Sequence, residues 1–120
     1  MPHILLADDD ESIAMVARLG LRRAGFTVTV VEDGLAALRA ARETRFDALV
    51  LDWNMPGQDG IDVCRQLHAD AAWNRVPIVF LTGATHEGAA QEALAAGARG
   101  VILKPFDPTT IGERVMELIT

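Results

Sequence analysis

The sequence predicts an α/β protein in which helices cover a doubly wound parallel sheet. Five short apolar runs alternate along the 120 residues with segments whose apolar residues recur at helical spacing. Continuous apolar strands that alternate with amphipathic helices are typical of a parallel sheet buried on both faces. Because crossovers between parallel strands are right-handed, such a sheet is expected to be doubly wound.

The predicted strands are the apolar runs themselves. The first and third runs end directly before acidic residues, and the second is rich in β-branched residues, which favour strands. Gly, Pro, Asn and Asp stand between many of the runs and the helical segments, as expected for turns. The expected strands are residues 4–7, 27–31, 48–51, 77–81 and 101–103.

Capping residues predict where the five helices begin and end. Gly25 is expected to end the first helix and Gly97 the fourth, because glycine favours the left-handed conformation that follows a helix. Asp33 is the predicted N-cap of the second helix. Asp107 and Pro108 are expected to open the last helix as N-cap and first-turn residue. The second, third and fourth helices are expected over 33–44, 61–71 and 86–96.

Apolar positions at helical spacing predict which helix faces are buried. The shared face of the first helix comprises Ile13, Val16, Ala17, Gly20, Leu21 and Ala24. The buried stripe of the last helix comprises Ile111, Val115 and Leu118. The loop between the third strand and the third helix is marked by Asn54, Pro56, Gly57 and Gly60.

Composition and charge narrow the class of protein. The net charge of −6 argues against a general nucleic-acid binder and against an anionic membrane surface. No apolar stretch reaches the roughly 20 residues that cross a bilayer. Cys64 is the single cysteine, so no disulfide can form within the chain, and a cytoplasmic location is expected. With no repeat or linker, residues 1–120 are expected to form one domain.

Polar side chains stand at the ends of four predicted strands. Asp8 and Asp9 follow the first strand, Asp52 the third, Thr82 the fourth and Lys104 the fifth. Because parallel strands point the same way, these residues are expected to meet at one edge of the sheet. Carboxylates packed together repel one another, and a hard dication with oxygen ligands relieves that repulsion.

This set of groups predicts phosphoryl chemistry with Mg²⁺, which keeps several waters and binds few carboxylates. Asp52 would act as the nucleophile and form an aspartyl phosphate. Lys104 would offer a point charge to the phosphoryl oxygens, and Thr82 would donate a hydrogen bond to them.

Four motifs resemble the signatures of response-regulator receiver domains. They are Leu-Ala-Asp-Asp-Asp-Glu at 6–11, Leu-Asp-Trp-Asn-Met-Pro at 51–56 followed by Asp59 and Gly60, Val-Phe-Leu-Thr-Gly at 79–83, and Leu-Lys-Pro-Phe at 103–106. The resemblance covers essentially the whole chain, and the Trp-Asn-Met-Pro run is most similar to chemotaxis-type, single-domain receivers. It implies the flavodoxin-like sheet with strand order 2-1-3-4-5 and five helices.

The resemblance also implies roles for individual residues. Asp52 would be the phosphorylation site, with a histidine kinase or histidine phosphotransfer protein as the donor. Asp8 and Asp9 would hold Mg²⁺ together with Asp52 and the backbone carbonyl of Asn54. The module would catalyse only its own phosphorylation and dephosphorylation, and would not be an enzyme in the ordinary sense.

Other implied features concern the switch. Thr82 and Lys104 would bind the phosphoryl group, and the Lys104–Pro105 peptide would be cis. Phosphorylation would alter the face of the fourth helix, fifth strand and fifth helix for an unknown protein target, with no direct contact to nucleic acid or membrane. Receivers usually carry an aromatic residue where this chain has Val101, which is stiff at χ1, so the usual coupling is expected to change. Ala84 predicts slow loss of the phosphoryl group.

Simpler interpretations apply to several residues. Asp10 and Glu11 are expected merely to begin a helix. Thr82 is alternatively a helix cap, and Lys104 a surface lysine. Trp53 is expected beside the site and partly exposed, and Cys64 is expected to be buried. Structural or surface roles are expected for His3, His68 and His86, and a solvated face for Arg18, Arg22 and Arg23.

Three other functions compete with the phosphorylated receiver. A degenerate receiver would act as a docking scaffold without phosphorylation. A haloacid-dehalogenase-type phosphohydrolase also combines strand-end aspartates, a threonine, a lysine and Mg²⁺, but needs a further acidic pair and a cap. A flavin binder of the flavodoxin type is disfavoured because the acidic first loop, Asp8 to Glu11, would repel a phosphate.

Overall fold

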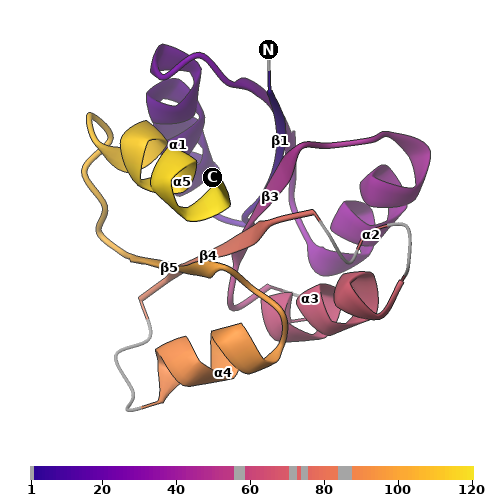
Figure 1. Cartoon of the computed structure of the whole chain (residues 1–120). Helices are drawn as coiled ribbons and strands as arrows, with labels where there is room; N and C mark the ends of the chain where they lie inside the picture. The colour runs from indigo at the N-terminus through magenta and orange to yellow at the C-terminus, as the bar shows by residue number, and fades with distance from the viewer. Residues whose placement is uncertain (1, 56–58, 71–72, 74–75, 84–87) are drawn as a thin grey trace.

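The structure, a computed structural model of the whole chain, describes residues 2–55, 59–70, 73, 76–83 and 88–120. Across these residues strands and helices alternate along the chain (Figure 1). Five positions used in the sequence interpretation lie outside the described residues: Pro56, Gly57, Ala71, Ala84 and His86.

Five parallel strands form the sheet. Their order is β2-β1-β3-β4-β5, which confirms the predicted order 2-1-3-4-5. β3 and β4 each extend one residue beyond the prediction, so Asp52 and Thr82 are the last residues of their strands. The strands are β1 (His3–Ala7), β2 (Thr27–Val31), β3 (Ala48–Asp52), β4 (Ile78–Thr82) and β5 (Gly100–Leu103).

Helices cover both faces of the sheet. They are α1 (Glu11–Arg23), α2 (Gly34–Glu43), α3 (Gly60–Ala69), α4 (Ala89–Ala95) and α5 (Ile111–Ile119). Figure 1 shows α1 and α5 side by side on one face, with α2 and α3 on the other. None of the helices in the described part of the chain has the length and apolar character that crossing a bilayer requires.

The core has one layer on each face of the sheet. In β3, Leu49 and Leu51 pack toward α2 and α3, whereas Val50 packs toward α1 and α5. All three side chains are fully buried, which explains why this strand is continuously apolar rather than alternating. Burial of each such side chain contributes about 1.5–3 kcal/mol.

Two predicted helix starts and two predicted helix ends at glycine residues are confirmed. Oδ1 of Asp10 accepts hydrogen bonds from the backbone N–H groups of Ser12 and Ile13, so Asp10 begins α1 as its N-cap. Asp33 accepts one from the N–H of Ala36 at 2.7 Å and caps α2. Gly25 and Gly97 have φ values of 100° and 108°, the left-handed conformation expected after a helix.

The predicted start of the last helix at Asp107 and Pro108 is wrong. α5 begins at Ile111, with Thr110 as its N-cap. Oδ1 of Asp107 accepts hydrogen bonds from the N–H and hydroxyl of Thr109, and its carbonyl accepts from the N–H of Thr110. With the bond from the N–H of Ile111 to the Asp107 carbonyl at 3.0 Å, they form a capped turn over residues 107–110 that leads directly into α5.

Two further helix predictions differ from the structure. α3 ends at Ala69 and α4 begins at Ala89 after Gly88, so both helices are shorter than predicted. Val16, placed on the apolar face of α1, is 40% exposed, whereas Ala14 is buried. The buried stripe of α1 is rotated toward Ala14 because α1 contacts both the sheet and α5. In α5, the predicted stripe holds: Ile111 and Val115 are buried and Leu118 is partly buried.

Candidate functional site

The strand ends bring the predicted polar residues to one edge of the sheet. β1 and β3 are neighbours, and Ala7 lies opposite Leu51 in their register. Asp8 therefore follows β1 directly beside Asp52, the last residue of β3. Thr82 ends β4 and lies opposite Leu103, so Lys104 continues past β5 at the same edge.

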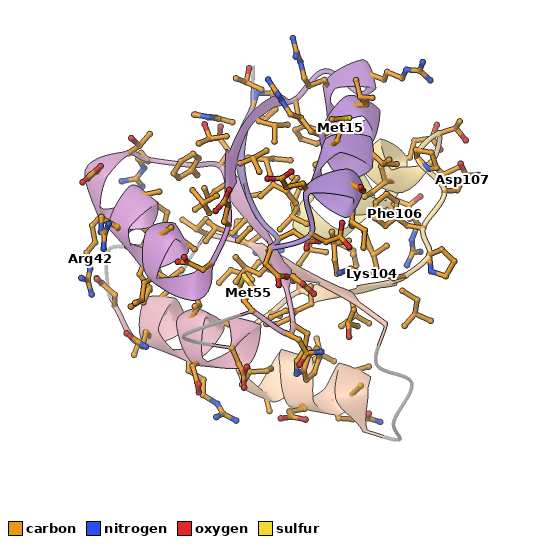
Figure 2. The ribbon with its side chains drawn as sticks, turned by 180° about the vertical axis from the view of Figure 1, so that it is seen from behind. Met15, Arg42, Met55, Lys104, Phe106 and Asp107 are labelled. Carbon is orange, nitrogen blue, oxygen red and sulfur yellow. The ribbon has the colours of Figure 1, made fainter. Side chains whose placement is uncertain are left out.

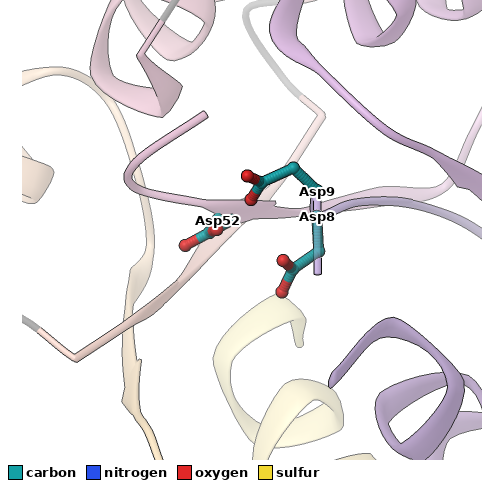
Figure 3. Close-up of side chains that lie close together, drawn as sticks. All are labelled: Asp8, Asp9 and Asp52. Carbon is teal, nitrogen blue, oxygen red and sulfur yellow. The ribbon is translucent and has the colours of Figure 1, made fainter. Parts of the chain in front are cut away.

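Three carboxylates meet there. Asp8, Asp9 and Asp52 each offer one oxygen, and these oxygens all lie within 4.8 Å of one another (Figure 3). Asp8 is 2% exposed and Asp52 is 6% exposed, while Asp9 is exposed to solvent. The predicted convergence of Asp8, Asp9 and Asp52 is confirmed, although their binding of a metal stays a prediction.

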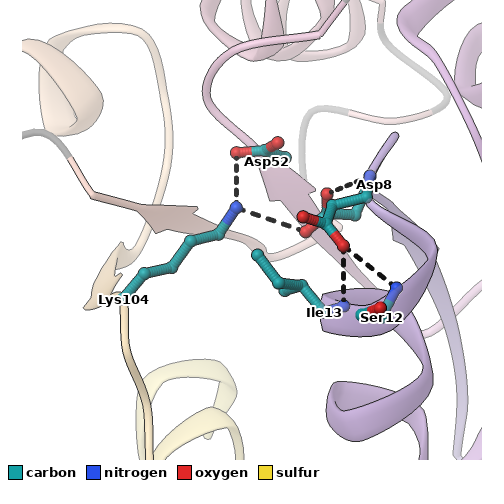
Figure 4. A network of polar contacts seen from close by, with 6 residues as sticks. Asp8, Ser12, Ile13, Asp52 and Lys104 are labelled. Atoms are coloured by element: carbon teal, nitrogen blue, oxygen red, sulfur yellow. Dashed lines mark hydrogen bonds and ion pairs between the residues drawn. The ribbon is translucent and has the colours of Figure 1, made fainter.

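Lys104 bridges the two buried carboxylates. Its Nζ donates a hydrogen bond to Oδ1 of Asp52 at 3.1 Å and lies 3.3 Å from Oδ2 of Asp8 (Figure 4). The backbone N–H of Lys104 donates to the carbonyl of Thr82, which anchors the end of β5 to β4. The alternative of a free surface lysine is therefore wrong, and the predicted cis peptide between Lys104 and Pro105 is confirmed.

Burial and the ion pair with the neighbouring residue shift the pKa values of Asp52 and Lys104 in opposite directions. Burial raises the pKa of Asp52 to about 6, and the negative charge of Asp8 adds to the rise. Hydrogen bonds from Lys104 and from the backbone N–H of Asn54 oppose it. Burial by itself would lower the pKa of Lys104, but its hydrogen bond to Asp52 and the charges of Asp52 and Asp8 raise it. At neutral pH the Lys104 ammonium therefore faces an Asp52 side chain that is mostly ionised.

This arrangement fits a divalent cation. Oδ1 of Asp8 accepts the backbone N–H of Asp10, and the buried Oδ2 forms an ion pair with Lys104 at 3.3 Å. Asp8, Asp9 and Asp52 together carry more negative charge than Lys104 neutralises, and they are hard oxygen donors of the kind that Mg²⁺ prefers.

Thr82 and Asn54 lie beside this cluster. Thr82 is buried as the last residue of β4, and α4 starts only at Ala89, so Thr82 is not the cap of that helix. Asn54 is exposed two residues after Asp52, and its backbone N–H bonds to the Asp52 carboxylate. The contact of Thr82 with a phosphoryl group and of the Asn54 carbonyl with a metal remain predictions.

The prediction that Trp53 is partly exposed is wrong. The residue is 8% exposed, and its ring centroid lies 5.2 Å from that of Phe80, with the rings tilted by 45°. Its backbone carbonyl accepts a hydrogen bond from the N–H of Gly60 at 2.9 Å. The chain after Asp52 thus places the indole in the core below the site, where a large apolar ring is more stable than in water.

Phe80 and Gly60 also shape the site, although the sequence predicted no chemical role for either residue. Alternation along β4 puts Phe80 on the same face of the strand as Thr82, two residues away, and this signal is readable from the sequence. The close approach of Gly60 to Asp52 depends on how α3 docks, and no local pattern encodes it. Cys64 is buried as predicted, and its Sγ donates to the carbonyl of Ala96 at 3.4 Å.

Comparisons with known proteins agree on the family to which the sequence is similar. The family model described as the response regulator receiver domain matches residues 4–116. The DNA-binding response regulator MtrA of Mycobacterium tuberculosis is 46% identical over 113 residues, covering 94% of this chain and 48% of MtrA. The chemotaxis protein CheY-3 of Vibrio cholerae is 36% identical over 113 residues, covering 93% of this chain and 87% of CheY-3.

A solved structure extends the comparison to the site. The receiver domain of the sensor histidine kinase PA1611 of Pseudomonas aeruginosa has a TM-score of 0.87 at 33% identity, covering 98% of this chain and 97% of that one. That receiver has a magnesium ion coordinated in its active site cleft. The chain spans about half the length of the MtrA relatives it matches. From its fold and sequence, the chain belongs to the family of response regulator receiver domains, the signalling modules of two-component systems.

Proposed function

We propose that this receiver accepts a phosphoryl group on Asp52 from a histidine kinase or a histidine phosphotransfer protein, and that the reaction depends on Mg²⁺. The observation that carries the proposal is the position of the Asp52 carboxylate, which lies at the end of β3 with Asp8, Asp9 and Lys104 around it. A bound Mg²⁺ would be held by Asp8, Asp9, Asp52 and the Asn54 carbonyl and would supply positive charge to the phosphoryl oxygens.

The transfer is a nucleophilic substitution at phosphorus. An ionised oxygen of Asp52 forms a bond to phosphorus, and the phosphorus–nitrogen bond of the donor phosphohistidine breaks. The bonding electron pair stays on the imidazole nitrogen, so the donor is released as histidine. Because the pKa of Asp52 is raised to about 6, the nucleophile is ionised at neutral pH and becomes protonated in mildly acidic solution.

Lys104 and Thr82 have defined parts in this step. Lys104 already contacts both buried carboxylates, so its ammonium is in place to contact a phosphoryl oxygen once Asp52 is modified. The hydroxyl of Thr82, at the neighbouring strand end, donates a hydrogen bond to another phosphoryl oxygen. Slow loss of the phosphoryl group remains a prediction, since Ala84 lies outside the described residues.

A groove next to the site suits a protein donor. It has a volume of about 400 Å³ and lies between α1 and the segment after β5, close to Lys104 and Phe106 (Figure 2). Its walls are mainly apolar, with Ile13 and Val16 on one side and Pro105 and Phe106 on the other. The exposure of Val16, unexpected from the sequence, fits the docking of a partner's apolar surface beside Asp52.

The output surface is proposed over α4, β5 and α5. Leu94 of α4, Leu103 of β5 and Met116 of α5 are exposed, and a groove lined by Val101, Leu103 and Arg114 lies between β5 and α5. Phosphorylation would change this surface for a protein target, without direct contact to nucleic acid or membrane. We place the reaction in the cytoplasm, where the single thiol of Cys64 stays reduced.

The test is covalent labelling by a small phosphodonor. Wild type would be incubated with phosphoramidate, with Mg²⁺ or with a chelator, and the intact mass measured. We expect a single added phosphoryl group that requires Mg²⁺ and disappears in Asp52→Asn. The matched control is Asp62→Asn, which changes an exposed aspartate of α3 and should be labelled like wild type. Labelling of Asp52→Asn, or labelling that ignores the metal, would rule out the proposed acceptor.

A further inference from the structure

We propose that Gly60 is a positioning residue for Asp52: the lack of a side chain at residue 60 lets α3 begin against the Asp52 backbone and thereby sets the place of the Asp52 carboxylate. This inference rests on the proposed function, since it concerns the acceptor of the phosphoryl group. Gly60 is the first residue of α3 and is buried.

The space at Gly60 is closed by groups that cannot move easily. A Cβ on this residue would overlap the carbonyl oxygen of Asp52 and would lie 3.2 Å from its carbonyl carbon. It would also lie 2.8 Å from Cε1 of Phe80. Two of these three atoms belong to the backbone of the acceptor residue itself, so an added methyl group presses directly on Asp52.

The requirement for glycine is spatial rather than conformational. Among the described glycines, positive φ values occur at Gly25, Gly88 and Gly97, and Gly60 is not one of them. The N–H of Gly60 donates to the carbonyl of Trp53, the residue after Asp52, at 2.9 Å. Two successive carbonyl groups of the acceptor segment therefore abut Gly60, and the start of α3 supports both.

Movement on the far side is also blocked. Phe80 is fully buried, and its ring contacts the indole of Trp53, so it has no free space into which to turn. A Cβ at residue 60 must consequently push the start of α3 and the Asp52 backbone apart, and Oδ1 of Asp52 is held 3.1 Å from Lys104 Nζ. A displacement of about 1 Å at a reacting group can slow a reaction on the order of a hundredfold.

The experiment compares two crowding substitutions, one beside Asp52 and one remote from it. Gly60→Ala is the test variant. Gly112→Ala is the control, because a Cβ there would overlap that of Ala24 at the contact between α1 and α5. Circular dichroism and thermal unfolding establish that both variants are folded at the assay temperature. The initial rate of labelling is then measured at saturating phosphoramidate and over a range of Mg²⁺ concentrations.

We expect the maximal labelling rate of Gly60→Ala, at saturating Mg²⁺ and donor, to fall by about tenfold or more. Gly112→Ala should lose stability but keep a maximal rate close to that of wild type. If Gly60→Ala and Gly112→Ala are labelled equally fast at saturation, the inference is overturned while the proposed function stands. If wild type itself is not labelled, it is the proposed function that fails.

A double variant separates the two contacts of the added methyl group. The double variant Gly60→Ala/Phe80→Leu removes the ring from the crowded side. It also provides the test of the proposal if Gly60→Ala alone does not fold. Because the overlap with the Asp52 carbonyl persists, we expect the double variant to be labelled more slowly than Phe80→Leu alone. Recovery of the wild-type rate in the double variant would contradict the role of Gly60 toward Asp52.

A spectroscopic measurement gives an independent check. The chain has two tryptophans, so Trp73→Phe leaves Trp53 as the sole fluorophore next to Asp52. In that background Gly60→Ala should shift the emission of Trp53, because the added Cβ would press on Phe80, whose ring contacts the indole. Gly112→Ala should leave the emission unchanged. An unaltered spectrum in Gly60→Ala would show that the acceptor segment has not moved and would count against the inference.

Discussion

The polar and the apolar neighbours of Asp52 are held in place by different forces. On one side Lys104 and Asp8 form a buried charge cluster with distances of 3.1 and 3.3 Å. On the other side Phe80 and Trp53 pack ring against ring with almost no exposure. The charge cluster depends on protonation and on cations, whereas the aromatic pair is stabilised by burial under all conditions that leave the chain folded.

The two sides of the Asp52 carboxylate therefore have different functions. The charge cluster sets three carboxyl groups against the single ammonium of Lys104, so its energy can change when a cation or phosphoryl group arrives. The aromatic side needs no ligand and supports the backbone that carries Asp52. Changes to the two sides should therefore differ in their response to Mg²⁺ and pH.

The largest expected effect is on the apolar side. Phe80→Ala should lower the free energy of unfolding by about 3–5 kcal/mol, because it leaves a cavity beneath Trp53. Chemical unfolding with urea would measure the loss, and it should be the same with and without Mg²⁺. Leu19→Ala, at a position 56% exposed, is the control and should cost little. A loss for Phe80→Ala no larger than that of the control would mean that the aromatic pair does not support the site.

The next effect is on the charged side. Lys104→Met removes the ammonium and leaves Asp8 and Asp52 facing each other, which should cost about 2–3 kcal/mol without Mg²⁺. Mg²⁺ should recover part of this loss, since it supplies the missing positive charge. Urea unfolding with Mg²⁺ or with a chelator would measure both values. Arg114→Met, which removes an exposed cation of α5, serves as the control, and an equal loss in both variants would contradict the prediction.

Mg²⁺ itself should stabilise the wild-type protein. At a concentration ten times its dissociation constant, a ligand that binds only the folded state adds about 1.4 kcal/mol to the free energy of unfolding. Thermal unfolding with and without Mg²⁺ would show the shift, which should be much smaller in Asp9→Asn. Because Asp9 is exposed, that variant should match wild type when a chelator is present. An equal Mg²⁺ response in both proteins would remove Asp9 from the site.

A further effect concerns pH. The pKa of Asp52 is raised from 3.8 to about 6, so between these values the folded state binds more protons than the unfolded state. The contribution of this group to stability is therefore largest below pH 4 and is lost as pH rises through about 6. Asp52→Asn should therefore be more stable than wild type by up to about 3 kcal/mol at pH 8 without Mg²⁺, since each pKa unit corresponds to about 1.4 kcal/mol. Thermal unfolding at pH 8 and at pH 4 would measure the difference, which should become much smaller at the lower pH.

Some expectations failed at places where local sequence competes with tertiary contacts. Asp107 and Pro108 form a typical helix start, yet hydrogen bonds to Thr109 and Thr110 hold a turn there and α5 begins at Ile111. Val16 shares the helical spacing of buried residues but is exposed, because the direction in which α1 packs is set by α5 and the sheet. Local patterns give the kind of element, and its neighbours set its rotation and its ends.

The five-stranded parallel sheet and the residues that meet at its functional edge can be predicted from the amino-acid pattern alone. Apolar runs specify the strands, and parallel strands necessarily end together, so Asp8, Asp52 and Lys104 meet although they are far apart along the chain. The depth at which Trp53 is buried and the close approach of Gly60 to Asp52 result instead from the packing of separate elements. Such contacts depend on distances of a few tenths of an ångström between separate elements, which no periodicity in the sequence records.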